Sequence, residues 1–392
     1  MNTAGKAVAT KHSQRVLYVV SEDWYFLSHR LPMARAARDA GFEVHVATRV
    51  VDGGGAISAE GFVLHPIPFV RGTLSPLSAL RTILALRHIH RAIAPRITHH
   101  VALQSALLGS LAALGCSTAS VNAMTGFGYT FTSNKAKARL IRPLLGALLR
   151  CLLSRPATVA LVQNPDDRAT LISLGIPQDR IALIPGSGVD TERLTFLPEP
   201  EGPATVAFAG RLLDDKGIRT LIAAHRLLRQ RGATVKLLVA GTPDLANPVS
   251  LTQKEMDGMA REPGIVWLGH VEDISSLWAR AHIAVLPSRR EGLPKALLEA
   301  AACGRPMIAT DVPGCREVVI QDKTGLLVPV DDPPALAAAI AALAEDAEAR
   351  ARYGKAARKL AVERFAADAI GRQIVALYRK LTDVTGRILP SS

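Results

Sequence analysis

The sequence has no long uninterrupted apolar run and no leader-like N-terminus. Its most apolar stretch, residues 101–121, is broken by Gln104, four serines and two glycines, whereas a membrane span needs about 20 consecutive apolar residues. The N-terminal MNTAGKAVATKHSQ is polar and leads directly into the strand-like RVLYVV, without the apolar core and cleavage site of a signal peptide. These absences predict a cytoplasmic protein.

Cysteine and aromatic residues are scarce. The four cysteines show no Cys-x-x-Cys spacing, which suits a reducing compartment and argues against structural zinc. Aromatic residues make up only 4% of the chain, and no recognised nucleic-acid motif accompanies the basic residues. Nucleic-acid binding therefore has little support, despite a pI of about 10.0.

Acidic residues are missing from one long segment. Between Glu60 and Asp166 there are eleven Lys or Arg and no Asp or Glu. Residues 1–200 hold 21 basic against 12 acidic residues, a net of +9, while the remainder holds 26 against 22, a net of +4. This one-sided charge favours an anionic partner, such as a membrane surface, a phosphorylated substrate or a nucleic acid.

Apolar strand-like segments alternate with amphipathic helical ones along the whole chain. RVLYVVS, EVHVAT and GFVLHPIPF are typical of strands in the first half, and ATVAFAG, VKLLVAG, IVWLGH, HIAVLPS and RPMIATD in the second. Strands that are apolar on both faces suit parallel sheets covered by helices. Because 392 residues exceed what one core usually supports, we predict an α/β protein with two doubly wound, Rossmann-like domains facing across a cleft, residues 1–190 and 191–392. We expect the last helices to pack back toward the first domain.

Two loops of the second half have residues suited to a phosphorylated ligand. In AFAGRLLDDKGI, Gly210 ends a strand and is followed by Arg211 and Lys216. Guanidinium and ammonium groups at the end of a strand can neutralise a diphosphate, although an ordinary solvated loop accounts equally well for this pattern alone. In WLGHVEDI, the loop around Val271 can present backbone groups to a nucleobase edge.

The stretch PSRREGLPKALLEAAACGRP contains the most specific pattern. A predicted strand ends at Ser288, and a predicted helix opens at Pro294, so backbone N–H groups and the helix dipole favour an anion there. A cation in the first turn, Lys295, is unfavourable unless an anion is nearby. Glu291 and Glu299 can accept hydrogen bonds from hydroxyls, although a helix-start and a helix-surface glutamate need no ligand.

Together, GRLLDDKG, PSRREGLPKALLEAAACGRPMIATDVPGCREVV and TGLLVP closely resemble glycosyltransferase family 4, a family of retaining, nucleotide-sugar-dependent enzymes with the two-domain GT-B fold. The resemblance covers most of the second half and, more weakly, the first. It implies that Arg211 and Lys216 bind the donor diphosphate, that Glu291 contacts the sugar and that Glu299 contacts the ribose. It also assigns to donor binding the residues Gly210, Val271, Gly292, Leu293, Pro294 and Lys295.

The first half is similar to a subgroup that extends lipid-linked sugars in bacterial surface polysaccharide assembly. The segments that carry this likeness are SEDWYFLSHRLPMARAARDAGFEVHVAT and VNAMTGFGYTF. The resemblance implies a polyprenyl-diphosphate-linked acceptor, with His29, His100, Thr125 and Gly126 on the acceptor side. Many members carry His-Gly where this chain has Thr125-Gly126, and a threonine cannot act as an imidazolium.

The segment SNKAKARLIRPLLGALLRCLLSRP predicts an amphipathic helix. Leucine or isoleucine pairs recur every four residues from 140/141 to 152/153, with basic residues beside or flanking them at 135, 137, 139, 142, 150 and 155. Such a helix can lie in the interface of an anionic bilayer, or it can bury its stripe in a core and expose a basic face. With the acid-free surroundings, we expect peripheral attachment to the inner face of the plasma membrane.

The resemblance also implies a mechanism. The acceptor attacks on the front face of the sugar while the leaving diphosphate takes up its proton, since no carboxylate is placed as a nucleophile. An Asp-x-Asp triplet, typical of metal-dependent transferases, does not occur, so we expect no metal and no cofactor. The donor is expected to be a UDP-hexose or UDP-N-acetylhexosamine. The alternatives are a sugar-nucleotide epimerase or hydrolase on the same fold, or a non-catalytic basic protein that binds membrane or nucleic acid.

Overall fold

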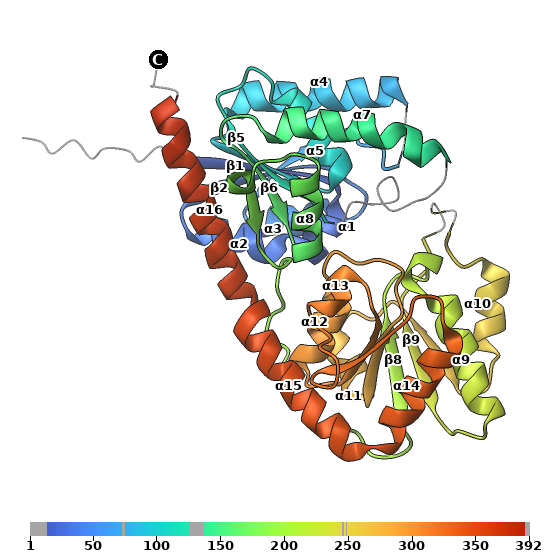
Figure 1. The fold of residues 1–392 in the computed structure, drawn as a ribbon. Helices are drawn as coiled ribbons and strands as arrows, with labels where there is room; N and C mark the ends of the chain where they lie inside the picture. Colours follow the sequence, from blue (N-terminus) through green and yellow to red (C-terminus); the bar gives the residue numbers. More distant parts are fainter. Residues whose placement is uncertain (1–13, 73–74, 126–135, 245–246, 248, 389–392) are drawn as a thin grey trace, which may run out of the picture. The chain divides into compact units, whose positions relative to one another are not determined.

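The computed structural model describes residues 14–72, 75–125, 136–244, 247 and 249–388, with the backbone alone for 136–142 and 384–388. The chain forms two compact units (Figure 1). The first contains the described residues up to Leu161, together with Leu174–Ala182 and the chain from Gly371; the second contains Val162–Ser173 and Leu183–Ile370. The polypeptide thus passes between the units at four positions, whereas the sequence predicts one boundary at residue 190, with the last helices packing back toward the first domain.

The first unit is built on a seven-stranded sheet in the order β3-β2-β1-β4-β5-β6-β7, in which β1 to β6 pair in parallel. The strands are β1 (Gln14–Glu22), β2 (Phe42–Arg49), β3 (Val63–Pro66), β4 (Ile97–Val101), β5 (Ala119–Ala123), β6 (Thr158–Val162) and β7 (Ile181–Leu183). The helices are α1 (Asp23–His29), α2 (Leu31–Asp39), α3 (Gly54–Ala59), α4 (Pro76–Ile93), α5 (Leu103–Ala112), α7 (Ala136–Leu153) and the short η1 (Gln178–Arg180).

The alternation of side chains along β1 places helices on both faces of this sheet. Leu17 and Val19 pack in a core with Leu86 of α4 and Ala112 of α5, whereas the intervening Tyr18 makes an edge contact with Phe26 of α1. Strands that are buried on both faces are what the doubly apolar sequence pattern predicts.

The second unit has a six-stranded parallel sheet in the order β10-β9-β8-β11-β12-β13. Its strands are β8 (Thr205–Ala209), β9 (Lys236–Ala240), β10 (Ile265–Gly269), β11 (Ile283–Leu286), β12 (Met307–Thr310) and β13 (Gly325–Val328). Its helices are α8 (Pro165–Ser173), η2 (Asp214–Lys216), α9 (Ile218–Gln230), α10 (Gln253–Ala260), α11 (Ile274–Ala279), α12 (Lys295–Ala302), α13 (Pro313–Arg316), α14 (Pro333–Glu345) and α15 (Ala347–Phe365).

The last helix, α16 (Ala367–Ile388), is fixed in the first unit by a buried polar contact. Tyr378 and Tyr18 join their hydroxyl groups at 2.9 Å, and the Tyr378 hydroxyl lies 2.5 Å from Nδ1 of His99. All three side chains are fully buried, and burial raises the pKa of both tyrosines and lowers that of His99. The trio is therefore neutral, and it ties the end of the chain to β1 and β4.

The proline-rich segment 191–203 belongs to the second unit. Three arginines hold it: Arg305 donates to the Pro198 carbonyl at 2.6 Å, Arg350 bonds Glu199 through Nε at 3.0 Å, and Arg358 donates to the Thr191 carbonyl at 2.9 Å. The backbone of this segment is thus fixed by charged donors rather than by secondary structure.

The prediction of an α/β protein with two doubly wound sheets is confirmed. Two strands that the sequence does not reveal are β4, with the sequence ITHHV, and β5, with ASVNA. Some of their polar atoms find partners inside the unit, since His100 Nδ1 lies 2.8 Å from Oδ1 of Asn122 and His99 pairs with Tyr378. Internal pairing lets a polar segment occupy a central strand.

We predict that Tyr378→Phe destabilises the protein by about 1–3 kcal/mol, because it leaves buried polar groups of His99 and Tyr18 without their partner. Tyr353→Phe, in another mostly buried tyrosine, is the matched control and should have a smaller effect. Thermal unfolding of both variants measures the difference; equal effects would mean that the trio does not stabilise the last helix.

Candidate functional site

In the second unit, the strand order reverses direction between β8 and β11. The loops that leave the carboxyl ends of these two strands contain Gly210-Arg211 and residues 287–294. Ligands of open parallel sheets bind outside the carboxyl ends of the strands at such a reversal point. The two most informative motifs of the sequence therefore meet at the position that the topology favours for a ligand.

An ion pair joins these two loops. Nζ of Lys216 lies 2.5 Å from Oε1 of Glu291, and the two side chains are only 25% and 8% exposed. The backbone requires glycine next to the lysine, because Gly217 has φ +71° and a Cβ there would lie 1.9 Å from the Pro287 carbonyl oxygen. This close approach brings two residues that are 75 positions apart into contact.

Glu291 is held from several sides. The Ser288 hydroxyl donates to Oε1 at 2.7 Å, and the Thr310 hydroxyl in turn donates to the Ser288 carbonyl. Gly314 at the start of α13 donates its N–H to the Glu291 carbonyl at 3.2 Å. A Cβ at Gly314 would lie 2.6 Å from the carbonyl oxygens of Glu291 and Gly292, so the absence of a side chain lets α13 pack directly under the turn.

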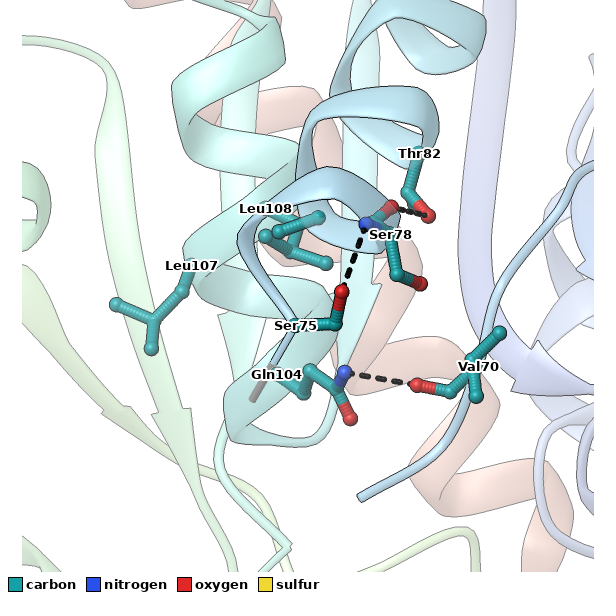
Figure 2. Close-up of a pocket in the computed structure, with 8 residues that line it drawn as sticks. Val70, Ser75, Ser78, Thr82, Gln104, Leu107 and Leu108 are labelled. Atoms are coloured by element: carbon teal, nitrogen blue, oxygen red, sulfur yellow. Dashed lines mark hydrogen bonds between the residues drawn. The ribbon is translucent and has the colours of Figure 1, made fainter. Parts of the chain in front are cut away.

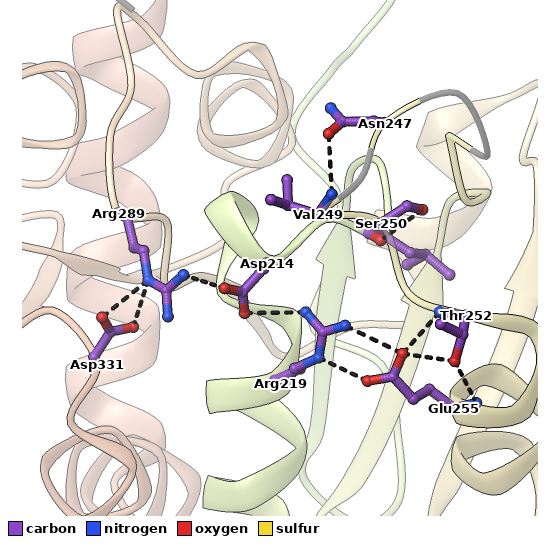
Figure 3. A network of polar contacts seen from close by, with 10 residues as sticks. Asp214, Arg219, Asn247, Val249, Ser250, Thr252, Glu255, Arg289 and Asp331 are labelled. Carbon is purple, nitrogen blue, oxygen red and sulfur yellow. Dashed lines mark hydrogen bonds and ion pairs between the residues drawn. The ribbon is translucent and has the colours of Figure 1, made fainter. Parts of the chain in front are cut away.

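A network of ion pairs holds the loop that contains Lys216 (Figure 3). Asp214 is bonded by Arg289 on one side and by Arg219 at 3.1 Å on the other. Arg219 continues to Glu255 at 2.8 Å and Arg289 to Asp331 at 2.9 Å, and the Arg219 bond lowers the pKa of Glu255 to about 2. The network fixes η2 between α9, α10 and the loop after β13.

The second basic candidate, Arg211, bonds Oδ2 of Asp244 at 2.8 Å. Asp244 follows β9, the strand next to β8. Arg211 is 37% exposed, so its guanidinium is held at the sheet edge but still reached by solvent. Arg211 and Lys216, both in the loop after β8, thus each form an ion pair with a carboxylate.

The predicted helix after the turn is α12, which Pro294 precedes directly. Lys295 lies 3.3 Å from Glu299 one turn later. Burial raises the pKa of Glu299, and the nearby Lys295 opposes this shift. Leu293 packs toward Gly186, where a Cβ would lie 2.8 Å from its Cδ2. The remaining donor-side candidate, Val271, is half-buried against the core of this unit just beyond β10.

Asn164, which the sequence analysis does not select, supports the same turn. Its Nδ2 donates to the Gly292 carbonyl at 2.8 Å and to Oδ2 of Asp167 at 2.9 Å, and its Oδ1 accepts from the Asp167 N–H at 2.8 Å. Asn164 is fully buried. The Asn-Pro-Asp-Asp sequence at the start of α8 predicts that Asn164 caps this helix. Nothing in the sequence indicates that Asn164 also contacts Gly292, 128 residues away.

The acceptor-side candidates lie in the first unit, and the structure describes three of the four. His29 is half-buried, stacks on Tyr25 with ring centroids 4.3 Å apart, and has Nδ1 2.6 Å from the Ser28 hydroxyl. Thr125 is half-buried two residues beyond β5. Gly126 lies outside the described residues. His29 and Thr125 remain predictions for the acceptor side.

The structure places His100 in the interior of the first unit rather than on the acceptor side. Its side chain is fully buried in β4, with Nδ1 2.8 Å from Asn122, and a Cβ at Gly109 would lie 2.2 Å from its ring. Burial lowers its pKa to about 3. A neutral ring enclosed between β4, β5 and α5 belongs to the interior and does not face an acceptor.

The helix predicted to lie on a membrane is α7. Of its described leucines, Leu149, Leu152 and Leu153 are buried, while Leu144 is 74% and Leu148 37% exposed. Much of the predicted stripe thus packs inward, and a short apolar strip stays on the surface. No helix in the part of the chain that the structure describes is both long and apolar enough to span a membrane.

Two family models match the chain, one in each half. Residues 15–163 match the model described as glycosyl transferase 4-like, and residues 203–346 match that described as glycosyl transferases group 1. The chain therefore belongs to the glycosyltransferases of the group 1 and 4-like type. Its two parallel, Rossmann-like sheets form the GT-B fold, as the solved structures below also show.

Three curated relatives illustrate the range of the likeness. The capsular polysaccharide biosynthesis glycosyltransferase CapM of Staphylococcus aureus is 31% identical over 44% of this chain and 45% of its own length. The alpha-maltose-1-phosphate synthase of Mycolicibacterium smegmatis is 27% identical over 84% and 89%. The N,N'-diacetylbacillosaminyl-diphospho-undecaprenol alpha-1,3-N-acetylgalactosaminyltransferase of Campylobacter jejuni is 24% identical over 91% and 98%.

Two solved structures share the fold. Sucrose-phosphate synthase of Thermosynechococcus elongatus has a TM-score of 0.79 at 22% identity, covering 94% of this chain and 99% of that one. HepE of Anabaena in complex with UDP-glucose has a TM-score of 0.76 at 17% identity, covering 93% and 99%. At these identities the likeness shows the fold alone.

The environment of Asp167 predicts a pH dependence. Burial raises the pKa of its carboxyl from 3.8 to about 6, against the opposing bond from Asn164. A carboxyl whose pKa is raised by folding binds more protons in the folded state, so its contribution to stability is present below pH 4 and is lost as pH rises from about 4 to 6. In the Asp167→Asn variant the side-chain oxygen can still accept the hydrogen bond from Asn164, but the side chain no longer carries a charge.

We therefore expect Asp167→Asn to raise the melting temperature relative to the wild type at pH 7.5 and to change it little at pH 4.5. Asp383→Asn, at an exposed position of α16, is the control and should not gain stability with pH in this way. If the difference in melting temperature between Asp167→Asn and the wild type is the same at both pH values, the Asp167 carboxyl does not have a raised pKa.

Proposed function

We propose that this protein is a retaining glycosyltransferase that moves a sugar from a UDP-hexose or UDP-N-acetylhexosamine to a polyprenyl-diphosphate-linked saccharide in bacterial surface polysaccharide assembly. The observation that carries the donor half of this proposal is the Lys216–Glu291 pair at the reversal point of the second sheet. A cation, a carboxylate and a helix N-terminus there provide groups for a diphosphate and for sugar hydroxyls.

The contacts of the site indicate a role for each group. Both hydrogen bonds to Glu291 end on Oε1, so Oε2 is the oxygen that can accept from a sugar hydroxyl. Lys216 has two further N–H groups for a phosphate oxygen, and Arg211 can reach a second one through its planar fork. Glu299, one turn into α12, would bond the ribose, while Val271 would flank the base.

The mechanism follows from where charge can be stabilised. Glu291 is already engaged by Lys216 and Ser288, which suits a binding carboxylate better than a nucleophile. Front-face attack is then the retaining route that needs no further carboxylate, and the departing diphosphate accepts the acceptor proton. Lys216, Arg211 and the start of α12 would stabilise the charge of the leaving group, so we expect transfer without a metal ion.

The acceptor half rests on likeness and charge. The Campylobacter relative is named for a diphospho-undecaprenol acceptor and CapM for capsular polysaccharide biosynthesis, while HepE was solved with UDP-glucose. The acid-free, basic segment 61–165 suits an anionic lipid at the inner face of the plasma membrane. The alternative of a soluble sugar-phosphate acceptor is favoured by the likeness to alpha-maltose-1-phosphate synthase.

We predict that purified protein transfers sugar from a UDP-sugar to polyprenyl-diphosphate-linked saccharide in excess chelator, with retention of the anomeric configuration seen by NMR. Lys216→Ala should lower kcat/KM about 100-fold or more, since a charged contact to the leaving group is lost. The control is Arg226→Ala, which removes an ion pair between α9 and Glu262, just beyond α10. This variant should keep full activity.

Each other outcome has a distinct meaning. Transfer to glucose 1-phosphate but not to the lipid-linked saccharide would support the soluble-acceptor alternative. Release of UDP without any acceptor would indicate a hydrolase, and loss of transfer in chelator would contradict the metal-free mechanism.

A further inference from the structure

The pocket of the first unit, shown in Figure 2, is lined by uncharged side chains among the described residues, and it has a volume of about 240 Å³. Its polar side chains bond neighbouring groups of the same wall. Gln104 donates to the Val70 carbonyl at 3.0 Å. Thr82 donates to the Ser78 carbonyl at 3.1 Å, and Ser75 accepts from the Ser78 N–H at 3.4 Å. These bonds serve the packing of α4 and α5, whereas the second unit gathers charged side chains at the carboxyl edge of its sheet.

In the second unit, three consecutive residues of the loop after β8 pair with three consecutive residues of the loop after β11. All three are ion pairs between residues 75 positions apart: Asp214–Arg289, Asp215–Arg290 and Lys216–Glu291. The central pair joins Oδ2 of Asp215 to a guanidinium nitrogen of Arg290 at 2.7 Å. We call these three ion pairs the ladder. Their equal separation along the sequence shows that the two loops run side by side in the same direction.

The backbone keeps the two loops in contact. The Arg289 N–H donates to the Asp215 carbonyl at 2.9 Å. Directly after the ladder, a Cβ at Gly217 would lie 1.9 Å from the Pro287 carbonyl oxygen. The strands before these loops, β8 and β11, pair in parallel. The ladder therefore continues the parallel pairing of the sheet beyond the ends of its strands.

The order of charges along the ladder favours a single register. One loop has the order acid, acid, base, and the other has base, base, acid. A shift by one residue would place Lys216 opposite Arg290 in one direction and Asp215 opposite Glu291 in the other. Like charges that face each other on adjacent strands are destabilising. Each shift thus places one member of the central pair against a like charge.

The central pair connects a structural network to the candidate site. At the outer end of the ladder, Asp214 and Arg289 belong to the ion-pair network of Figure 3. At the inner end, Lys216 and Glu291 are 25% and 8% exposed and form the most buried of the three pairs. The central pair lies between them, with side chains that are 35% and 38% exposed.

We propose that Asp215 and Arg290 are positioning residues, which set the register in which Lys216 meets Glu291. The inference rests on the proposed function, in which those two groups bind the nucleotide-sugar. A shift of one residue moves a side chain by about 3.3 Å along an extended chain, which is more than a hydrogen bond tolerates. Asp215 and Arg290 thus act on the donor through Lys216 and Glu291.

The test is an exchange of charges within the central pair, measured as transfer from a UDP-sugar at a temperature below the melting transition of every variant. Asp215→Arg and Arg290→Asp each place like charges opposite one another and should lower kcat/KM about tenfold or more. The double variant restores opposite charges and should return kcat/KM to within about threefold of the wild type. A double variant as inactive as the product of the two single losses would overturn the inference, because Arg290 or Asp215 would then contact the substrate itself.

The matched control is the same exchange in the surface pair of Arg226 and Glu262. Arg226→Glu and Glu262→Arg should lower the melting temperature as single variants and leave kcat/KM unchanged. A tenfold loss of kcat/KM in these variants would mean that reduced stability alone accounts for the effect at the ladder, which would contradict a positioning role.

Melting temperatures measured without ligand separate the ladder from the proposed activity. Asp215→Arg and Arg290→Asp should each lower the melting temperature, and the double variant should recover most of the loss. This recovery in a protein whose wild type transfers no sugar would support the register and contradict the proposed function. Losses that simply add in the double variant would overturn the register, whatever reaction the protein catalyses.

Discussion

The site in the second unit depends on one ion pair, between Lys216 and Glu291. It joins the loops after β8 and β11, and those strands flank the point where the sheet order reverses. Glycine at 217 and 314 allows the backbone to approach this closely, and the network from Asp331 to Glu255 keeps the lysine loop in place. The loops after β8 and β11 are therefore held in place by contacts within the protein, as stabilisation of a leaving diphosphate in the proposed reaction requires.

The first unit uses a different constraint, in which polar groups are paired inside the core. His99 with Tyr378 and Tyr18, and His100 with Asn122, form hydrogen bonds between fully buried side chains. These side chains therefore serve the interior of the unit and hold β1, β4, β5 and the last helix together.

Sequence reasoning reached the fold because strands and helices depend on local signals, such as the apolar runs that end near Gly210 and Ser288. The donor roles of Arg211, Lys216, Glu291 and Glu299 come from the resemblance to family 4, and they stay predictions. Sequence reasoning did not reach Asn164, whose contact with Gly292 spans 128 residues, and it misplaced His100, since nothing local distinguishes a buried histidine from a ligand-binding one. The strands β4 and β5 were hidden for the same reason: their polar residues find partners only in the folded unit.

The most direct test of the central claim is a thermal-shift panel of UDP, GDP, ADP and dTDP with purified protein and no metal ion. The account predicts a stabilising shift that is largest for UDP, is lost in Arg211→Ala and Lys216→Ala, and is kept in the Arg226→Ala control. A shift that survives both substitutions would place the nucleotide elsewhere. No shift with any of the four would contradict a nucleotide-sugar site at the Lys216–Glu291 pair.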